Sequence, residues 1–393
     1  MANMILNTPG GAGQVPAGNV IVGNGYTGNL STFNGKLFVF DFENTPEPVD
    51  PLNPLNLPIN TIRCKFTNGY TPDMGETQTL VDADENIWDI TNSSNSWINL
   101  FSQNTNLLEV LGANTKTVTT MSSLFEGCSS LTNVALFNTS NVTDMSRMFR
   151  NCSSLINVQP FDTSNVIYMN NTFSSCEKIT TIPLFDTSKV TDMLGMFSGC
   201  SLLTIVPLLD TSNVETMVGM FNSCISLTSI PLFNTSNVTD MSGMFNSCIS
   251  LTTVPLLDTS NVTDMHWLFY NCTSLASVPL FDTSSVTNMN GMFEGCSSIT
   301  TSPLFDTSSV TNMRNMFNEC TSLTSVPLLD TANVTDMESM FYSCTNVQNG
   351  SLALYQQASS QINTPAHYLT FKNCGINTTQ GAAELSQIPD DWK

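Results

Sequence analysis

The stretch Leu251–Cys272, LTTVPLLDTSNVTDMHWLFYNC, returns with small changes every 24 residues through the middle of the chain. Its last residue fixes the register, because ten successive copies end on a cysteine: Cys128, Cys152, Cys176, Cys200, Cys224, Cys248, Cys272, Cys296, Cys320 and Cys344. A fixed period of roughly 20 to 50 residues is typical of a solenoid, in which each coil buries its apolar side chains against its neighbours. The sequence therefore predicts a repeat solenoid.

The apolar positions within one copy predict a short strand followed by a short helical turn. Val254 and Leu256 are two residues apart, which places both side chains on one face of a strand. Met265, Leu268 and Phe269 stand at i, i+3 and i+4, which places all three on one face of a helical turn. Turn-forming residues occupy positions 258–261 between these two segments. Each coil is thus expected to contain a short parallel strand, a polar turn and a short helical turn.

The register extends beyond the cysteines and sets the expected domain boundaries. Trp97 and Phe101 lie 24 residues before Met121 and Phe125, so about eleven coils are predicted over residues 97–350. Such a stack needs a cap at each end, since an open end exposes backbone groups and apolar side chains. We expect residues 61–96 to form a β cap, with strands at Ile62–Phe66 and Ile87–Ile90 and with Trp88 and Trp97 over the first coil. Residues 351–393 are expected to form a helical cap, with short helices at 352–358, 366–371 and 382–387.

Residues 1–60 differ from the repeat in composition. They hold 8 of the 21 glycines and 7 of the 18 prolines, with two apolar islands at Val20–Val22 and Lys36–Phe42. This composition is typical of extended chain rather than of a domain with its own core. Each island is long enough to add a strand to the open sheet edge of a partner. We interpret residues 1–60 as an attachment segment.

The repeat carries a family resemblance. The pattern NxCxSLTxVPLxDTSNVTxMxxMF, read from Asn246 to Phe269, resembles the BspA-like leucine-rich repeats of bacterial surface proteins, although its period of 24 is slightly short for that group. The resemblance covers roughly residues 97–350 and implies a leucine-rich-repeat-like solenoid. The ALYQQAS and GAAELSQIPDDW runs of the tail resemble the endings of repeat proteins from bacteriophages of gut bacteria. Neither resemblance specifies a function, because repeat folds serve many binding roles.

Composition excludes several classes of partner. Lys and Arg number 11 against 32 Asp and Glu, for a formal net charge of −21, so a nucleic-acid-binding surface is not expected. No apolar run approaches 18 residues, so no membrane span is expected. Position 1 is not followed by the basic region and apolar core of a secretory signal, and the last residues do not suggest an anchor. Only two histidines are present, His266 and His367. The sequence has no nucleophile elbow and no phosphate loop, and no pair of carboxylates stands outside the ladders. We therefore expect no enzyme activity, no cofactor and no metal site.

Three ladders of identical residues have structural interpretations. The cysteines point the same way in register, which disfavours disulfides, and free cysteine is often buried, so a ladder of buried thiols is expected. Aspartates at the 258 and 264 positions alternate with Asn, as at Asn138 and Asn234, which favours turn and N-cap roles over a calcium-binding stripe. The methionine ladder is interpreted as core filler rather than a copper site.

One coil carries the candidate contact surface. Four other coils have Gly at the position of Trp267, as at Gly243 and Gly291, whereas this coil has His266, Trp267 and Tyr270. Exposed aromatic residues on a repeat scaffold are often contact residues. We expect the Trp267 ring to lie across both neighbouring coils with one edge exposed.

Two functional classes fit these observations. The first is a non-enzymatic structural protein of a bacteriophage virion, such as a head or tail fibre, on the virion surface after synthesis in the host cytoplasm. Its partners would be other virion proteins through residues 1–60 and a host cell-surface protein or glycan through the solenoid. The alternative is a BspA-like adhesin on a bacterial cell surface. The lack of an export signal or anchor and the reduced cysteines favour the virion protein. The chain could also form a homo-oligomer. A third functional class, suggested by the Thr-rich segments, is an ice-binding or enzymatic solenoid.

Overall fold

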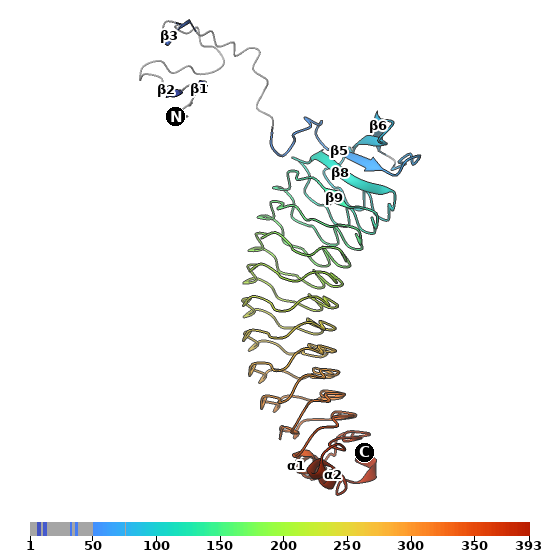
Figure 1. Cartoon of the computed structure of the whole chain (residues 1–393), viewed down its shortest axis with the longest axis vertical. Coiled ribbons are helices and arrows are strands. Elements are labelled where there is room, and N and C mark those ends of the chain that lie inside the picture. The colour runs from blue at the N-terminus through green and yellow to red at the C-terminus, as the bar shows by residue number, and fades with distance from the viewer. Residues whose placement is uncertain (1–5, 9–10, 14–31, 34–35, 38–49, 75) are drawn as a thin grey trace. The chain divides into compact units, whose positions relative to one another are not determined.

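The computed structural model describes residues 6–8, 11–13, 32–33, 36–37, 50–74 and 76–393, which fall into two compact units, Met1–Pro51 and Leu52–Lys393 (Figure 1). In the first unit, β1 (Leu6–Thr8) pairs antiparallel with β2 (Gly11–Gly13), and β3 (Thr32–Phe33) pairs antiparallel with β4 (Lys36–Leu37). The predicted apolar island Val20–Val22 lies outside the described residues, as do residues 38–42 of the second island.

A five-stranded sheet closes the N-terminal end of the second unit. Its order is β6 (Thr77–Asp82), β7 (Ile87–Thr91), β5 (Thr61–Phe66), β8 (Leu107–Asn114) and β9 (Asn133–Val134), and all neighbours are antiparallel except β8 and β9. Ile62, Cys64 and Phe66 alternate along β5 and are buried, as a strand with one covered face requires. Because β8 belongs to the first coil, this sheet joins the cap to the solenoid. The strands predicted at Ile62–Phe66 and Ile87–Ile90 are confirmed.

The segment just before β5 also packs in the second unit. Leu57 is buried, and its carbonyl oxygen accepts a hydrogen bond from the Asn114 side-chain amide at 2.8 Å. The Asn60 N–H donates to the Asn114 carbonyl oxygen at 2.8 Å. The break between the units therefore lies at Pro51, earlier than the predicted end of the attachment segment at residue 60.

The predicted helical turn of each coil is wrong, because its backbone N–H groups donate to the next coil. The N–H groups of Met265, Trp267 and Phe269 donate to the carbonyl oxygens of residues 288, 290 and 292 at 3.0, 2.9 and 2.9 Å. Two residues in this segment, Trp267 and Asn271, each have a φ of 55°, and the same two positions are left-handed in coil after coil. Left-handed residues break the right-handed α-helical path, so tight turns and single-residue parallel bridges replace the helix.

The predicted strand at Val254 and Leu256 is also wrong. Val254 is 9% exposed and Leu257 is 4% exposed, whereas Leu256 is 62% exposed, so the buried side chains are three residues apart. Pro255 between them lacks an N–H and cannot take part in a regular ladder. Before the proline, the Thr252 N–H donates to the Thr228 carbonyl oxygen of the preceding coil at 3.1 Å, and the Thr252 hydroxyl donates to the same oxygen at 3.3 Å. Within the described coils, regular strands occur only at β8 and β9.

Each coil contributes a phenylalanine to a continuous stack in the core. The rings of Phe221, Phe245 and Phe269 are buried, with centroid distances of 5.9 and 5.5 Å between neighbours and interplanar angles of 9° and 2°. These separations lie in the range in which offset aromatic rings attract each other. The stack runs from Phe101 to Phe371, and the methionine ladder packs around it, with Met241 and Met265 fully buried. The interpretation of methionine as core filler is confirmed.

The cysteine ladder lies beside this stack. All twelve cysteines are buried and free, and the Cys248 thiol donates to the carbonyl oxygen of Phe221 in the preceding coil at 3.0 Å. The same hydrogen bond recurs at each of the ten ladder positions, at 3.0 or 3.1 Å. Burial raises the pKa of the Cys248 thiol to about 12. The burial predicted for the ladder is confirmed, and the hydrogen bond gives a reason for a thiol there.

The aspartate ladders cap turns, as predicted. The Asp258 carboxylate accepts hydrogen bonds from the Ser260 N–H and hydroxyl at 3.1 and 2.7 Å, and Asn234 accepts the same two from Ser236. In the second ladder, Asp264 accepts from the N–H of His266 at 2.8 Å. Across the described part of the chain, no three His, Cys, Asp or Glu side chains are grouped so that they could hold a metal ion.

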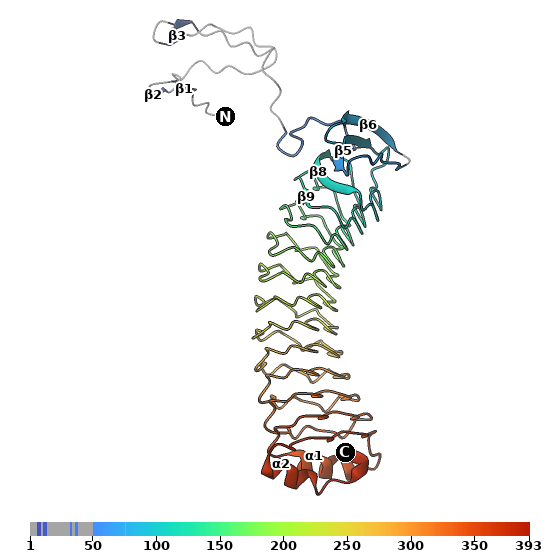
Figure 2. The ribbon, with the colours of Figure 1, turned by 45° about the vertical axis from the view of Figure 1, so that its right-hand side comes forward.

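The C-terminal end is a further coil with a helical insertion (Figure 2). Helix α1 (Ser351–Ser359) and helix α2 (Thr379–Leu385) confirm two of the three predicted helices, and a short 3₁₀ helix, η1 (Asp390–Trp392), ends the chain. Residues 366–371, predicted as a helix, instead form a coil, in which Ala366 bridges Asp336 and the Phe371 ring continues the stack. The spacing from 336 to 366 is 30 rather than 24 residues, because α1 is inserted. Trp392 covers the Phe371 ring at a centroid distance of 6.2 Å.

Candidate functional site

The backbone under the predicted contact surface is held on both sides by neighbouring coils. The Trp267 N–H donates to the Asn290 carbonyl oxygen at 2.9 Å, and the Gly243 N–H donates to the His266 carbonyl oxygen at 2.9 Å. The Tyr270 carbonyl oxygen accepts from the Ser247 N–H at 2.7 Å. Because hydrogen bonds to both neighbouring coils hold this backbone in place, its side chains project from a fixed backbone.

Trp267 occupies a left-handed position at which four other coils have glycine. Its φ is 55°, and the equivalent residues Gly195, Gly219, Gly243 and Gly291 have φ values of 56–58°. The need for a positive φ explains the glycines that the sequence showed at this position. A bulky residue in this region of φ is uncommon, and such strain is concentrated at functional sites. Five further coils have other residues at this position, with φ values of 54–56°: Ser123, Arg147, Asn171, Asn315 and Ser339. Trp267 is therefore distinguished by its side chain rather than by its backbone conformation.

The Trp267 ring lies against the following coil. A Cβ atom added to Gly291 would come within 2.6 Å of the Trp267 Cδ1 atom, so the ring covers this glycine and leaves no room for a side chain there. No atom of Trp267 lies within 4 Å of the equivalent position at Gly243. The expectation that the ring spans both neighbours is thus met on one side only. The exposed edge is confirmed, since Trp267 is 44% exposed.

The structure brings the three predicted residues together as an aromatic cluster. The ring centroids of His266 and Trp267 are 5.2 Å apart and those of Trp267 and Tyr270 are 6.4 Å apart, both edge to face. The Nδ1 atom of His266 lies 2.7 Å from a carboxylate oxygen of Asp264, which fixes the imidazole beside the turn. Trp267 and Tyr270 line a groove, and His266 supports the cluster from the side.

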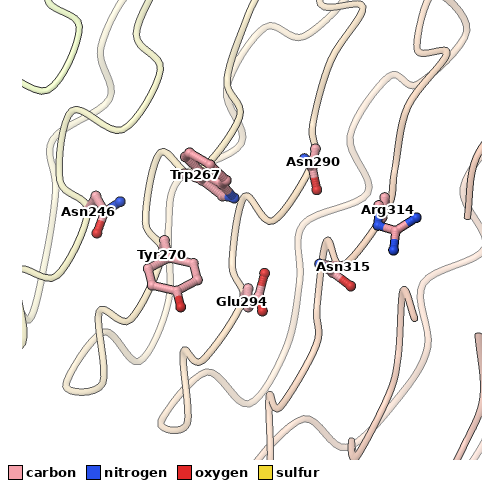
Figure 3. Close-up of a pocket in the computed structure, with 7 residues that line it drawn as sticks. All are labelled: Asn246, Trp267, Tyr270, Asn290, Glu294, Arg314 and Asn315. Atoms are coloured by element: carbon pink, nitrogen blue, oxygen red, sulfur yellow. The ribbon is translucent and has the colours of Figure 1, made fainter. Parts of the chain in front are cut away.

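The groove has a volume of about 480 Å³ and crosses successive coils (Figure 3). Besides Trp267 and Tyr270, it is lined by Asn246, Asn290, Glu294, Arg314 and Asn315. One coil position is occupied by Asn246, Tyr270 and Glu294 in three consecutive coils. A second position is occupied by Trp267 and, two coils later, by Asn315. Sequence reasoning missed these five polar residues, yet adding or subtracting 24 from Tyr270 leads to Asn246 and Glu294.

Charge at the groove is concentrated on one carboxylate and one guanidinium. Burial, together with the charge of Glu319, raises the pKa of the Glu294 carboxyl above its usual value. Asn318 partly offsets this, since its side-chain amide donates to Glu294 at 3.2 Å. Arg314 is paired with Glu338 and lies 3.7 Å from Asp336, so it forms a charged rim. A groove with an aromatic wall and a polar rim is suited to bind a side chain or a small polar group of a partner.

One protein-family model matches the sequence three times, over residues 95–204, 172–277 and 251–355, and is described as "Mycoplasma protein of unknown function, DUF285". These matches cover the repeat region predicted at residues 97–350. No curated protein matches the chain. The resemblance of the tail to phage repeat proteins stays a prediction.

Solved structures similar to this chain include a leucine-rich repeat protein and a peptide hormone receptor. They include a leucine-rich repeat protein from Eubacterium ventriosum, with 18% identity, 60% of this chain and 77% of that chain covered, and a TM-score of 0.35. The Toll–Spatzle complex of Drosophila has 14% identity, 66% and 35% coverage, and a TM-score of 0.30. The plant peptide hormone receptor RGFR1 in complex with RGF2 has 12% identity, 60% and 43% coverage, and a TM-score of 0.26. This chain spans less than half the length of the latter two.

Proposed function

The chain belongs to the family described as "Mycoplasma protein of unknown function, DUF285", and from that premise we propose that it is a non-enzymatic solenoid that binds a partner protein through the Trp267 groove. The observation that supports this proposal most directly is the Trp267 ring, which is 44% exposed and forms one cluster with His266 and Tyr270. Among the described coils, only this one has aromatic side chains at all three of these positions. The groove combines the exposed Trp267 and the half-buried Tyr270 with Arg314, and Trp, Tyr and Arg are the residue types that dominate binding energy at protein interfaces.

The role of the groove in binding is tested by giving its coil the residues found at the same positions of the preceding coil. The triple variant His266→Ser, Trp267→Gly and Tyr270→Asn introduces the residues found at 242, 243 and 246. We expect binding to weaken at least about tenfold, since the loss of an anchoring aromatic costs about 1.4 kcal/mol or more. The melting temperature should hardly change, because the replacements suit this backbone. The matched control Tyr168→Asp changes an exposed tyrosine in another coil to the residue at 192 and should leave binding intact.

The binding measurement uses labelled protein on intact bacterial strains and on cultured epithelial cells. Protease treatment of the cells should abolish binding, and periodate treatment should not, because we propose a protein partner. The reverse pattern would identify a glycan and contradict that part of the proposal. Equal binding by the triple variant and the natural protein would show that the aromatic cluster serves packing alone.

We further propose that the protein is carried on a bacteriophage particle as a fibre or decoration protein. The twelve buried, free cysteines support synthesis and assembly in a reducing cytosol. The second candidate is a bacterial cell-surface adhesin, which the family description favours because it names a cellular organism. Antibodies against the solenoid distinguish the two: they should label sedimenting phage particles in the first case and cell envelopes in the second. None of the helices in the described part of the chain has the length and apolar character needed to span a bilayer.

In either setting we propose that the segment before Leu52 attaches the protein to the phage particle or to the cell envelope. The second unit, Leu52–Lys393, has its own core and cap. A variant that begins at Leu52 should therefore melt like the full chain and still bind cells, yet fail to join the particle or envelope. Normal incorporation of the shortened protein would contradict the attachment role.

A further inference from the structure

A line of exposed leucines runs along the solenoid. At 24-residue intervals from Leu184 to Leu328, seven consecutive coils each present a leucine that is 56–68% exposed. Each follows a half-buried proline and precedes a buried residue, as Leu256 lies between Pro255 and Leu257. We call this line the leucine stripe. Contiguous apolar surface on a folded protein commonly marks an interaction site, whereas isolated exposed leucines do not.

Two polar ladders flank the leucine stripe. Two residues after each leucine comes an exposed acidic or amide side chain, which is Asp in six coils and Asn234 in one. Three and four residues before most of the leucines come hydroxyl side chains, such as Thr252 and Thr253, which are exposed in the central coils. The stripe thus has an acidic edge and a hydroxyl edge. We propose that it is the contact surface for a second copy of this chain, packed stripe to stripe with the two stacks running in the same direction.

The spacing of the stripe favours a second copy over other partners. Coils bridged in parallel lie about 4.8 Å apart, so the leucines recur at that interval. The side chains on one face of a strand recur at roughly 6.8 Å, and the turns of an α-helix at about 5.4 Å. A helix would drift by half an interval over about four coils, whereas another stack of the same coils stays in register along all seven.

The size of the surface fits a stable dimer. Seven coils span roughly 34 Å along the stack, and residues 252–258 span at most about 20 Å across it. The resulting face of roughly 700 Å² per copy approaches the ~800 Å² per partner of standard protein interfaces. The interface would therefore have an apolar centre and two polar edges, which is the usual arrangement.

Charge decides the direction of packing. With the stacks parallel about a twofold axis that runs along the stripe, the acidic edge of one copy faces the hydroxyl edge of the other. With the stacks antiparallel, the two acidic edges face each other, and like charges disfavour that arrangement. The Thr252 hydroxyl already donates to the preceding coil, whereas hydroxyls three residues before the leucines, such as that of Thr253, can donate to the opposing carboxylates of the parallel dimer.

The dimer is tested by sedimentation velocity over a range of protein concentrations. The variant Leu232→Ser, Leu256→Ser and Leu280→Ser removes three central leucines, each about three-fifths exposed. We expect its dimer dissociation constant to rise at least about tenfold. The control variant Leu202→Ser, Ile225→Ser and Ile249→Ser changes three exposed apolar residues outside the stripe and should leave that constant within about twofold. A natural protein that sediments as a monomer at every concentration would overturn the proposal, as would equal weakening by both variants.

Orientation is tested by disulfide formation, because all twelve native cysteines are buried. In the parallel dimer, Leu184→Cys at one end of the stripe meets the same residue of the second copy and should crosslink with itself under mild oxidation. In an antiparallel dimer it would instead meet position 328. Crosslinking that requires a mixture of Leu184→Cys and Leu328→Cys chains would overturn the parallel packing. The groove variant, with its stripe intact, should dimerise normally, so a failure here is distinct from a failure of the proposed function.

Discussion

The core stack and the Trp267 groove lie within the same coil and follow different rules. Phe245 and Phe269 stack between near-identical neighbours, and Cys248 and Cys272 repeat the same hydrogen bond one coil apart. At the groove the repeat is broken, since Trp267 stands where neighbouring coils have Gly243 and Gly291. Residues that recur in every coil therefore account for folding. Residues that depart from the repeat without a packing reason are the ones to examine for function.

Removing one ring from the stack should show the largest difference between the two regions. Phe245→Ala is expected to lower the free energy of unfolding by about 3–5 kcal/mol, because the ring is fully buried and the cavity cannot close between two coils of fixed spacing. Urea-induced unfolding followed by circular dichroism measures this loss. Trp267→Gly is the matched change in the groove and should cost less than about 1 kcal/mol, since it relieves the left-handed backbone. Similar losses of unfolding free energy for both variants would show that the core stack and the groove do not differ in their contribution to folding.

The cysteine ladder should show an intermediate effect. Cys248→Ala removes a buried sulfur and its hydrogen bond to the Phe221 carbonyl oxygen, and we expect a loss of about 1 kcal/mol. The Phe221 carbonyl oxygen still accepts from the Cys224 N–H at 3.0 Å, so it is not left without a partner. The same unfolding measurement applies, with the exposed Ile249→Ala as the control outside the core. A loss above about 3 kcal/mol would mean that the thiol does more than fill space.

The turn ladder should show the smallest effect, visible only as a dependence on pH. Hydrogen bonds from the following serine lower the pKa of the carboxyl groups of Asp186, Asp210, Asp282 and Asp306. A carboxyl whose pKa is lower in the folded state stabilises that state above its unfolded pKa of about 3.9. This contribution is lost as the pH falls toward the folded-state pKa. Stability should therefore decline slightly in acid as these groups protonate.

The fourfold Asp→Asn variant at these positions provides the control. Asn keeps the oxygen that accepts from serine, as Asn138 and Asn234 already show, but it does not titrate. Melting curves between neutral pH and about pH 3 should thus be flatter for this variant than for the natural protein. Identical acid dependence in the two proteins would assign the effect to other carboxylates.

The repeat itself, the buried cysteines and the capping aspartates could be predicted from sequence, because each depends on spacing and residue type alone. The conformation of the coil could not, since Met265, Leu268 and Phe269 fit a helical turn as well as the turn that forms. The glycines at 243 and 291 were the available signal for a left-handed backbone. Leu256 and Leu257 are adjacent and equally apolar, so their residue type does not show which one is buried. The neighbouring Pro255 was the only sequence signal for this choice. The coil at residues 366–371 was not predicted because α1 shifts its spacing.

The direction of the backbone hydrogen bonds has a consequence for how this chain can change length. Along the turn segment each coil gives its donors to the coil that follows and its acceptors to the coil that precedes, as Phe245 and Phe269 do at 3.0 and 2.9 Å. Any two coils can therefore form the same set of hydrogen bonds, with the N–H donors of one coil opposite the carbonyl acceptors of the other. Losing or duplicating a whole 24-residue copy restores the same hydrogen bonds without a new kind of contact. Residues inserted within the turn segment would shift donors away from acceptors, whereas residues inserted outside it are tolerated, as α1 is between Asp336 and Ala366. Successive versions of such a protein can grow or shrink in steps of one coil, with the reach of the solenoid set by copy number and the two ends left unaltered.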